Sequence, residues 1–95
     1  MAVEIGTVQT FSDVKPDKAQ ALKVLGEAAE VFGAWQQWDG LDQDEKDNGF
    51  NVICLTNECV DVIQATCNLL AALGVTDVTW HMEACRQRNV ERGRM

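Results

Sequence analysis

The segment LKVLGEAAEVFGAW, residues Leu22–Trp35, decides the fold of this chain. Its only charged residues are Lys23, Glu27 and Glu30, and every other position is apolar or glycine. On a helix with 100° per residue, the three charged side chains fall within a stripe about 60° wide. The pattern therefore predicts a helix that must be buried on most sides and that carries one narrow charged stripe.

A second segment, LTNECVDVIQATCNLLAALGV, repeats this pattern over Leu55–Val75. Its only charged residues are Glu58 and Asp61, and no positive charge offsets them. Residues three apart lie on the same face of a helix, as they do in the pair Glu27 and Glu30. Acids are rarely buried unless they are paired or bind a metal. Two apolar helices, each with one acidic pair, are therefore expected.

The remaining sequence places these helices in order. The first is predicted over about residues 16–38, where Pro16 suits a first helical turn, and the second over about 52–73. A third is predicted over about 78–91. Residues 1–13 are interpreted as an extended N-terminal arm, and residues 39–51 as an acidic loop or a short frayed turn.

The predicted fold class is all-α, a single domain over residues 1–95 formed by an antiparallel helical bundle. A chain of this size buries only about 60–65% of its unfolded surface. Yet 46% of its residues are hydrophobic, and three helices of one short chain cannot cover them on all sides. We expect a homo-oligomer, a homodimer or homotetramer, whose interface completes the core.

Charge and cysteine usage exclude several classes of function. The net charge of −7 disfavours binding to duplex nucleic acid, because Lys and Arg must neutralise phosphates there. No apolar run approaches about 18 residues and no signal-peptide pattern opens the chain, so neither a membrane partner nor export is expected. The cysteines form no C-x-x-C pair and are interpreted as small core residues. The expected location is the reducing cytoplasm.

The two acidic pairs predict a metal site. Antiparallel packing of the first two long helices can bring four carboxylates together: Glu27, Glu30, Glu58 and Asp61. Four carboxylates within a few ångströms repel one another and do not all stay ionised without a cation. Mg²⁺ is the expected cation, with Mn²⁺ as an alternative, because it prefers oxygen ligands and often shares its shell with substrate phosphates.

The motifs together resemble a known family. The order is E-x-x-E, 27 intervening residues and E-x-x-D, and the text of Leu22–Trp35 and Leu55–Val75 is similar to the two metal helices of the MazG-like nucleoside triphosphate pyrophosphohydrolases. The ending RNVERGR, Arg88–Arg94, also resembles that of several members. The resemblance covers most of the chain after residue 15. It implies the all-α NTP pyrophosphatase fold.

The resemblance implies an enzyme, a nucleotide pyrophosphohydrolase. It would hydrolyse a nucleoside or deoxynucleoside triphosphate to the monophosphate and pyrophosphate with Mg²⁺. The implied magnesium ligands are the four carboxylates of the acidic pairs: Glu27, Glu30, Glu58 and Asp61. The expected catalytic acceptor of the proton of the attacking water is either Glu30 or Glu27.

Further residues are candidates for binding the substrate. The resemblance assigns triphosphate contacts to three residues of the basic ending: Arg88, Asn89 and Arg92. A solvated helix end would also explain these charges. Lys23 can contact a phosphate or pair with Glu27. Trp38 can stack on a nucleobase, although a tryptophan at a helix end also serves as a core or interface anchor.

Two departures from the family pattern leave alternatives open. Gly26 precedes Glu27, where many members carry a second Glu, and Val60 precedes Asp61, where Gly is frequent. One alternative is a helical oligomerisation or regulatory module of the same fold without turnover. The other is a phosphoribosyl-ATP pyrophosphatase.

Overall fold

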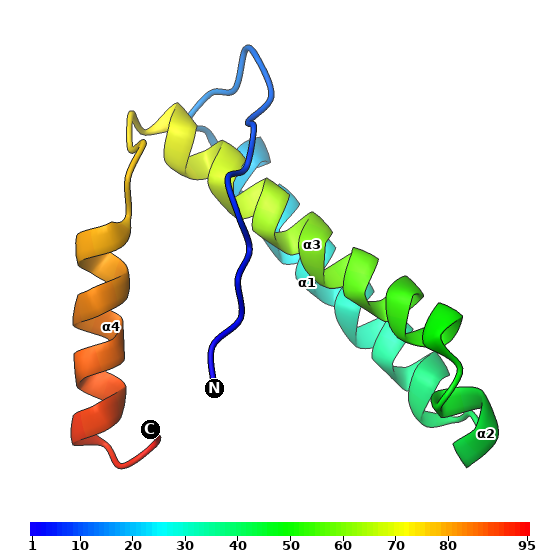
Figure 1. The fold of residues 1–95 in the computed structure, drawn as a ribbon. Helices are drawn as coiled ribbons and strands as arrows, with labels where there is room; N and C mark the ends of the chain where they lie inside the picture. The colour runs from blue at the N-terminus through cyan, green and yellow to red at the C-terminus, as the bar shows by residue number, and fades with distance from the viewer.

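The computed structural model describes residues 1–95 and contains helices but no strand. The helices are α1 (Lys18–Asp39), α2 (Gln43–Lys46), α3 (Gly49–Ala72) and α4 (Thr79–Glu91) (Figure 1). The predicted all-α class is confirmed. None of the helices combines the length and the apolar character that crossing a membrane requires.

Side-chain caps mark where α1, α2 and α3 begin. The backbone N–H of Gln20 donates to the Asp17 carboxylate at 2.9 Å, so α1 begins two residues later than the predicted Pro16. Asn48 caps α3 by accepting from the backbone N–H of Phe50 at 2.9 Å, and α3 therefore starts three residues earlier than predicted. Part of the predicted acidic loop is the short helix α2, which Asp42 caps in the same way.

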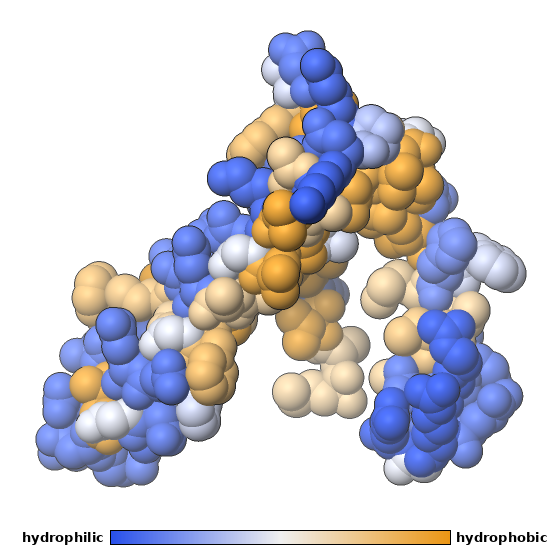
Figure 2. All heavy atoms as spheres, turned by 180° about the vertical axis from the view of Figure 1, so that it is seen from behind, coloured by the Kyte–Doolittle hydropathy of each residue, from blue (hydrophilic) through white to orange (hydrophobic).

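Helices α1 and α3 form an antiparallel hairpin that is the main body of the molecule (Figure 1). Its interior is thin, because only Ala65 and Asn68 of the whole chain are buried. Large apolar side chains remain open on both long helices, for example Leu25 and Ile53, which are 66% and 57% exposed. Figure 2 shows hydrophobic side chains at the surface on the face of the molecule that it draws.

Helix α4 stands apart from the hairpin (Figure 1). Gly74, with φ of +80°, ends α3, and the N–H of Val75 donates to the carbonyl of Leu70 at 2.9 Å. This is the glycine-dependent turn that closes many helices, and it redirects the chain away from α3. Helix α4 then packs along neither α1 nor α3.

Residues 1–10 form neither helix nor strand, and this N-terminal arm docks on α3 through amides. The N–H of Phe11 donates to Oδ1 of Asn68 at 3.0 Å, and Nε2 of Gln64 donates to the carbonyl of Gln9 at 3.0 Å. Asn68 is the most buried residue of the chain, with 3% of its surface exposed. The arm is therefore held against the C-terminal part of α3.

Asp77 accepts two hydrogen bonds from Thr79 at the start of α4. Its Oδ1 accepts from the backbone N–H of Thr79 at 2.9 Å and from the Thr79 hydroxyl at 2.6 Å. These hydrogen bonds lower the pKa of Asp77 below its usual range. A lowered pKa adds stability above the unfolded-state pKa, and this stability is lost as the pH falls through the folded-state value.

We expect Asp77→Ala to lower the Tm at pH 7, with a difference from the wild type that shrinks below about pH 4. Thermal melts followed by circular dichroism between pH 3 and pH 7 measure this. Asp44→Ala is the matched control, because the Asp44 side chain is exposed and makes no hydrogen bond. A difference that is the same at pH 3 and pH 7 would contradict the role given to the Asp77 carboxylate.

Candidate metal centre

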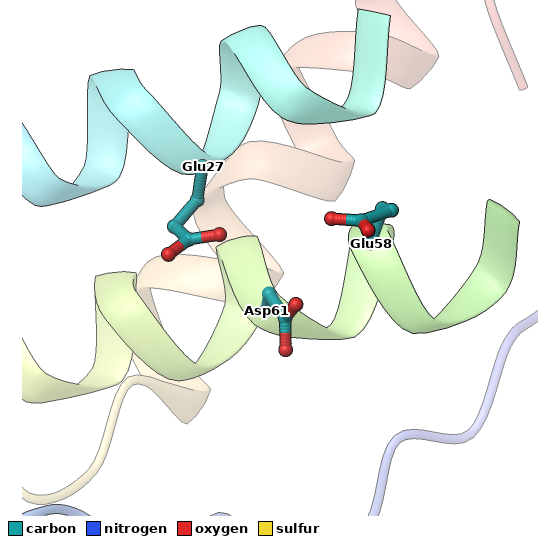
Figure 3. A group of neighbouring side chains, drawn as sticks. All are labelled: Glu27, Glu58 and Asp61. Atoms are coloured by element: carbon teal, nitrogen blue, oxygen red, sulfur yellow. The ribbon is translucent and has the colours of Figure 1, made fainter. Parts of the chain in front are cut away.

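The middle of the hairpin gathers three carboxylates (Figure 3). Glu27 comes from α1, while Glu58 and Asp61 come from one face of α3 because they are three residues apart. One oxygen of each lies within 4.8 Å of the others. The structure therefore brings together three of the four predicted metal ligands.

Glu30 lies beside this cluster rather than in it. It is exposed, and the group of three oxygens does not include it. It is nevertheless close enough to raise the pKa of Glu27, chiefly because protonated Glu27 can hydrogen-bond to the Glu30 carboxylate. Desolvation and the negative charges of Glu30 and Asp61 raise that pKa further, whereas the charge of Lys23 lowers it.

The raised pKa of Glu27 reflects the crowding of acidic groups around it, first of all Glu30 and then Asp61. A carboxyl with a raised folded-state pKa adds stability below its unfolded-state pKa and loses this contribution as the pH rises through the folded-state value. At neutral pH, Glu27 is therefore in an unfavourable electrostatic environment in the metal-free protein. A cation between the carboxylates would remove this disadvantage.

Glu58 supplies an independent indication of a cation. Its Oε2 is buried and has no hydrogen-bond partner. A buried carboxylate oxygen without a partner carries a desolvation cost that a bound metal ion would offset. The cluster contains no His or Cys, which favours a hard cation such as Mg²⁺ over Zn²⁺.

The three carboxylates are near enough for one small cation to draw them together. Ligand oxygens of Mg²⁺ are about 2.9 Å apart when adjacent and about 4.2 Å apart when opposite, and the three oxygens here lie within 4.8 Å of one another. Small rotations of the flexible Glu side chains make up the difference. The residues that would hold the ion are Glu27, Glu58 and Asp61.

Lys23 lies on the same face of α1 as Glu27, one turn nearer the N-terminus. Together with Glu27 and Asp61, it lines a cavity of about 270 Å³. The Lys23 ammonium makes no ion pair within the 4.0 Å limit of a salt bridge. It is therefore available to an anionic group that enters the cavity.

Trp38 lies on the other side of the cluster, where it lines a second cavity of about 260 Å³ with Glu58. The ammonium of Lys46 sits 5.1 Å from the centre of its ring and 3.8 Å from an oxygen of Asp39. Lys46 therefore covers one face of the indole by a cation–π interaction. Trp38 is near the predicted site, but one of its two stacking faces is taken.

The basic ending does not reach the carboxylates within this chain. Arg88, Asn89 and Arg92 belong to α4 or its C-terminal end, and α4 packs along neither helix of the hairpin. The Asn89 side chain donates to the carbonyl of Cys85 at 3.0 Å and accepts from Arg94 at 3.2 Å. In this chain the Asn89 side chain is therefore hydrogen-bonded within the C-terminal end of α4.

Four polar or aromatic residues at the site were not predicted from the sequence. Phe11, Gln20, Gln64 and Asn68 line the 270 Å³ cavity with the acids and Lys23. Three of them continue the polar stripes of α1 and α3 at helical spacing, which is a signal that the sequence contains. Phe11 comes from the arm and has no such signal.

The segments that resemble the MazG-like family lie at the centre of the packed helices α1 and α3, where they form the carboxylate cluster. Comparison of the chain with protein-family models, curated proteins and solved structures gave no match. Membership of the MazG-like family therefore stays a prediction.

Proposed function

We propose that this protein is a cytoplasmic enzyme that hydrolyses a nucleoside or deoxynucleoside triphosphate to the monophosphate and pyrophosphate with Mg²⁺. One observation carries the proposal: three carboxylate oxygens from two helices converge within 4.8 Å. The unpartnered Oε2 of Glu58 supports a cation there. The resemblance of the two acidic motifs to the MazG-like family supplies the reaction.

Each residue of the site has a distinct part in this proposal. Glu27, Glu58 and Asp61 would hold Mg²⁺, which when bound polarises phosphoryl oxygens and neutralises charge that develops on them. Glu30 lies next to Glu27 but outside the ligand cluster, so its carboxylate is free to accept a proton from the attacking water. Lys23 would contact the phosphates from the cavity that it shares with the acids.

We also propose that the active form is a homo-oligomer. The chain exposes 7621 Å², whereas a compact monomer of 10.5 kDa exposes about 5,400 Å². The excess of about 2,200 Å² per chain is of the size that a permanent interface between subunits buries. A second copy is the proposed occupant of the open apolar surface, and its packing would also give α4 a partner.

The arginines of α4 fit this arrangement. Arg88 and Arg92 are exposed and make no ion pair within their own chain, while the hairpin carries the acidic cluster. Opposite charges favour the approach of α4 from one chain to the hairpin of another. The triphosphate contacts predicted for Arg88, Asn89 and Arg92 would then come from a neighbouring subunit.

The experiment is a pyrophosphate-release assay on the purified protein with a panel of (d)NTPs, modified dNTPs and phosphoribosyl-ATP, each with Mg²⁺, with Mn²⁺ and with EDTA. We expect at least one nucleoside triphosphate to release pyrophosphate in the presence of Mg²⁺ or Mn²⁺ and none to do so with EDTA. Turnover of phosphoribosyl-ATP alone would assign the protein to that activity instead. No turnover anywhere in the panel would contradict the enzyme and favour a helical module without catalysis.

A further inference from the structure

The side chains that line the cavity beside the carboxylates change in type from one end of the cavity to the other. It has a volume of about 270 Å³ and contains Glu27 and Asp61 at one end of its lining. Going back along α1, Lys23 and then Gln20 follow on the same face, one turn apart. The lining thus changes from carboxylate to ammonium to amide over seven residues, which is about 10 Å of helix.

Helix α3 shows the same order in the opposite chain direction. Asp61 is followed on its face by Gln64 and then Asn68, and all three line the cavity. Because α1 and α3 are antiparallel (Figure 1), the acidic ends of the two rows line the cavity together, and so do the amide ends. The cavity is therefore charged at the cation site and neutral but polar away from it.

The amide end keeps unused hydrogen-bonding groups. Oδ1 of Asn68 accepts from the N–H of Phe11 at 3.0 Å and from Nε2 of Gln64 at 3.1 Å. These bonds leave Oε1 of Gln64 and Nδ2 of Asn68 without a hydrogen bond, and the side-chain amide of Gln20 also makes none. Donors and acceptors are thus both available to a ligand.

The arm closes this end of the cavity with an aromatic ring. Phe11 lines the cavity, its backbone is fixed to Asn68, and the residue is 63% exposed. A ring that is anchored by its backbone yet open to solvent has a free face on which a flat ligand can stack. No core role accounts for this ring in the single chain.

We propose that this cavity binds the nucleoside part of the substrate, with the base stacked on Phe11 and its polar edge on the amides of Gln20, Gln64 and Asn68. The inference rests on the proposed function, because the phosphates would lie at Lys23 and the cation. The volume of about 270 Å³ is slightly below the roughly 300 Å³ at which small-molecule sites start, so the cavity encloses part of a nucleotide rather than all of it. The N-terminal arm is then part of the binding site.

The test compares two ligands and two variants by calorimetric titration at saturating Mg²⁺. The ligands are an α,β-imido nucleoside triphosphate and inorganic tripolyphosphate, which lacks the nucleoside. We expect Phe11→Ala to weaken binding of the nucleotide about 10-fold or more and that of tripolyphosphate less than 2-fold. Val3→Ala is the control, because Val3 is exposed on the same arm and lines neither the carboxylate cavity nor the Trp38 cavity.

A second variant tests the amide end without disturbing the arm. Gln20→Ala removes a side chain that holds no other group, and we expect it to change the ranking of the four bases in the same titration. Equal weakening of both ligands by Phe11→Ala would show that the arm only supports the cation site. Unchanged binding of both ligands would exclude Phe11 from the site. Either result would overturn the nucleoside assignment.

These outcomes separate the inference from the proposed function. If the wild type releases pyrophosphate but Phe11→Ala binds the nucleotide normally, the nucleoside cavity is wrong and the enzyme stands. If the wild type releases none, the enzyme is wrong and the titration still decides on the cavity. A wild type that binds the nucleotide no more tightly than tripolyphosphate would overturn the cavity in either case.

Discussion

Glu58→Gln is expected to remove both the stabilisation of the protein by Mg²⁺ and about 10³-fold of its turnover, the equivalent of about 4 kcal/mol of transition-state stabilisation. Glu58 belongs to the cluster of three oxygens and has the buried oxygen that lacks a partner. In the wild type, Mg²⁺ at 100 times its Kd would add about 2.7 kcal/mol to the free energy of unfolding. Differential scanning fluorimetry with and without Mg²⁺ measures the resulting shift in Tm.

The Tm of Glu58→Gln without Mg²⁺ shows whether the substitution acts on metal binding or on the stability of the fold. Replacing one carboxylate by a neutral amide reduces repulsion within the cluster, so we expect the metal-free Tm of Glu58→Gln to equal or exceed that of the wild type. Glu45→Gln on α2 is the control and leaves both the Mg²⁺ shift and turnover unchanged, because Glu45 lies outside the cluster. A full Mg²⁺ shift in Glu58→Gln would refute the cation site.

Glu30→Gln distinguishes holding the metal from moving a proton. Glu30 lies outside the group of three oxygens, so the variant is expected to keep the Mg²⁺ shift in Tm. If Glu30 accepts the proton of the attacking water, turnover falls about 10²-fold or more in the same variant. Loss of the Mg²⁺ shift would instead make Glu30 a ligand, as the family resemblance implies.

The second large effect is expected at the open apolar surface. Leu25 and Phe32 lie on one face of α1, seven residues apart, and are 66% and 59% exposed in the single chain. If a second copy covers them, Leu25→Asp places an unpaired carboxylate in an apolar interface, at a cost of about 3 kcal/mol or more. We expect dissociation of the oligomer and a Tm lower by more than about 10 °C.

Sedimentation velocity and a thermal melt at the same protein concentration measure both effects. Gln43→Asp is the control, since it adds the same charge to an exposed polar position at the start of α2, away from the face of α1 that carries Leu25 and Phe32. A monomeric wild type would contradict the oligomer, because its Leu25 would then face water and tolerate the aspartate. A wild-type oligomer that Leu25→Asp leaves intact would place the interface elsewhere.

The long helices and most of the carboxylate cluster could be predicted because their determinants are local. Runs of apolar residues broken only by acids at i and i+3 define both the helices and the face on which the acids lie. Antiparallel pairing then brings Glu27 close to Glu58 and Asp61. Glu30 departs from this pattern, since its i, i+3 spacing places it beside the cluster but not within it.

The rest of the site depends on contacts between distant segments. The backbone N–H of Phe11 donates to Asn68, which is 57 residues away in the sequence. No pattern of residues in the arm predicts this contact. Lys46 covers Trp38 because α2 turns back towards the end of α1. The short helix α2 was not predicted, because the polar, acidic composition of residues 39–51 is typical of a loop. The position of α4 could not be predicted either, because its packing lies outside the hairpin.

The most direct test of the central claim is ³¹P nuclear magnetic resonance of a nucleoside triphosphate incubated with the wild-type protein and Mg²⁺. The account predicts equal amounts of nucleoside monophosphate and pyrophosphate. The triphosphate should persist over the same time when EDTA replaces Mg²⁺ or when the Glu58→Gln variant replaces the wild type. Formation of the diphosphate and inorganic phosphate, or an unchanged triphosphate for every base tested, would contradict it.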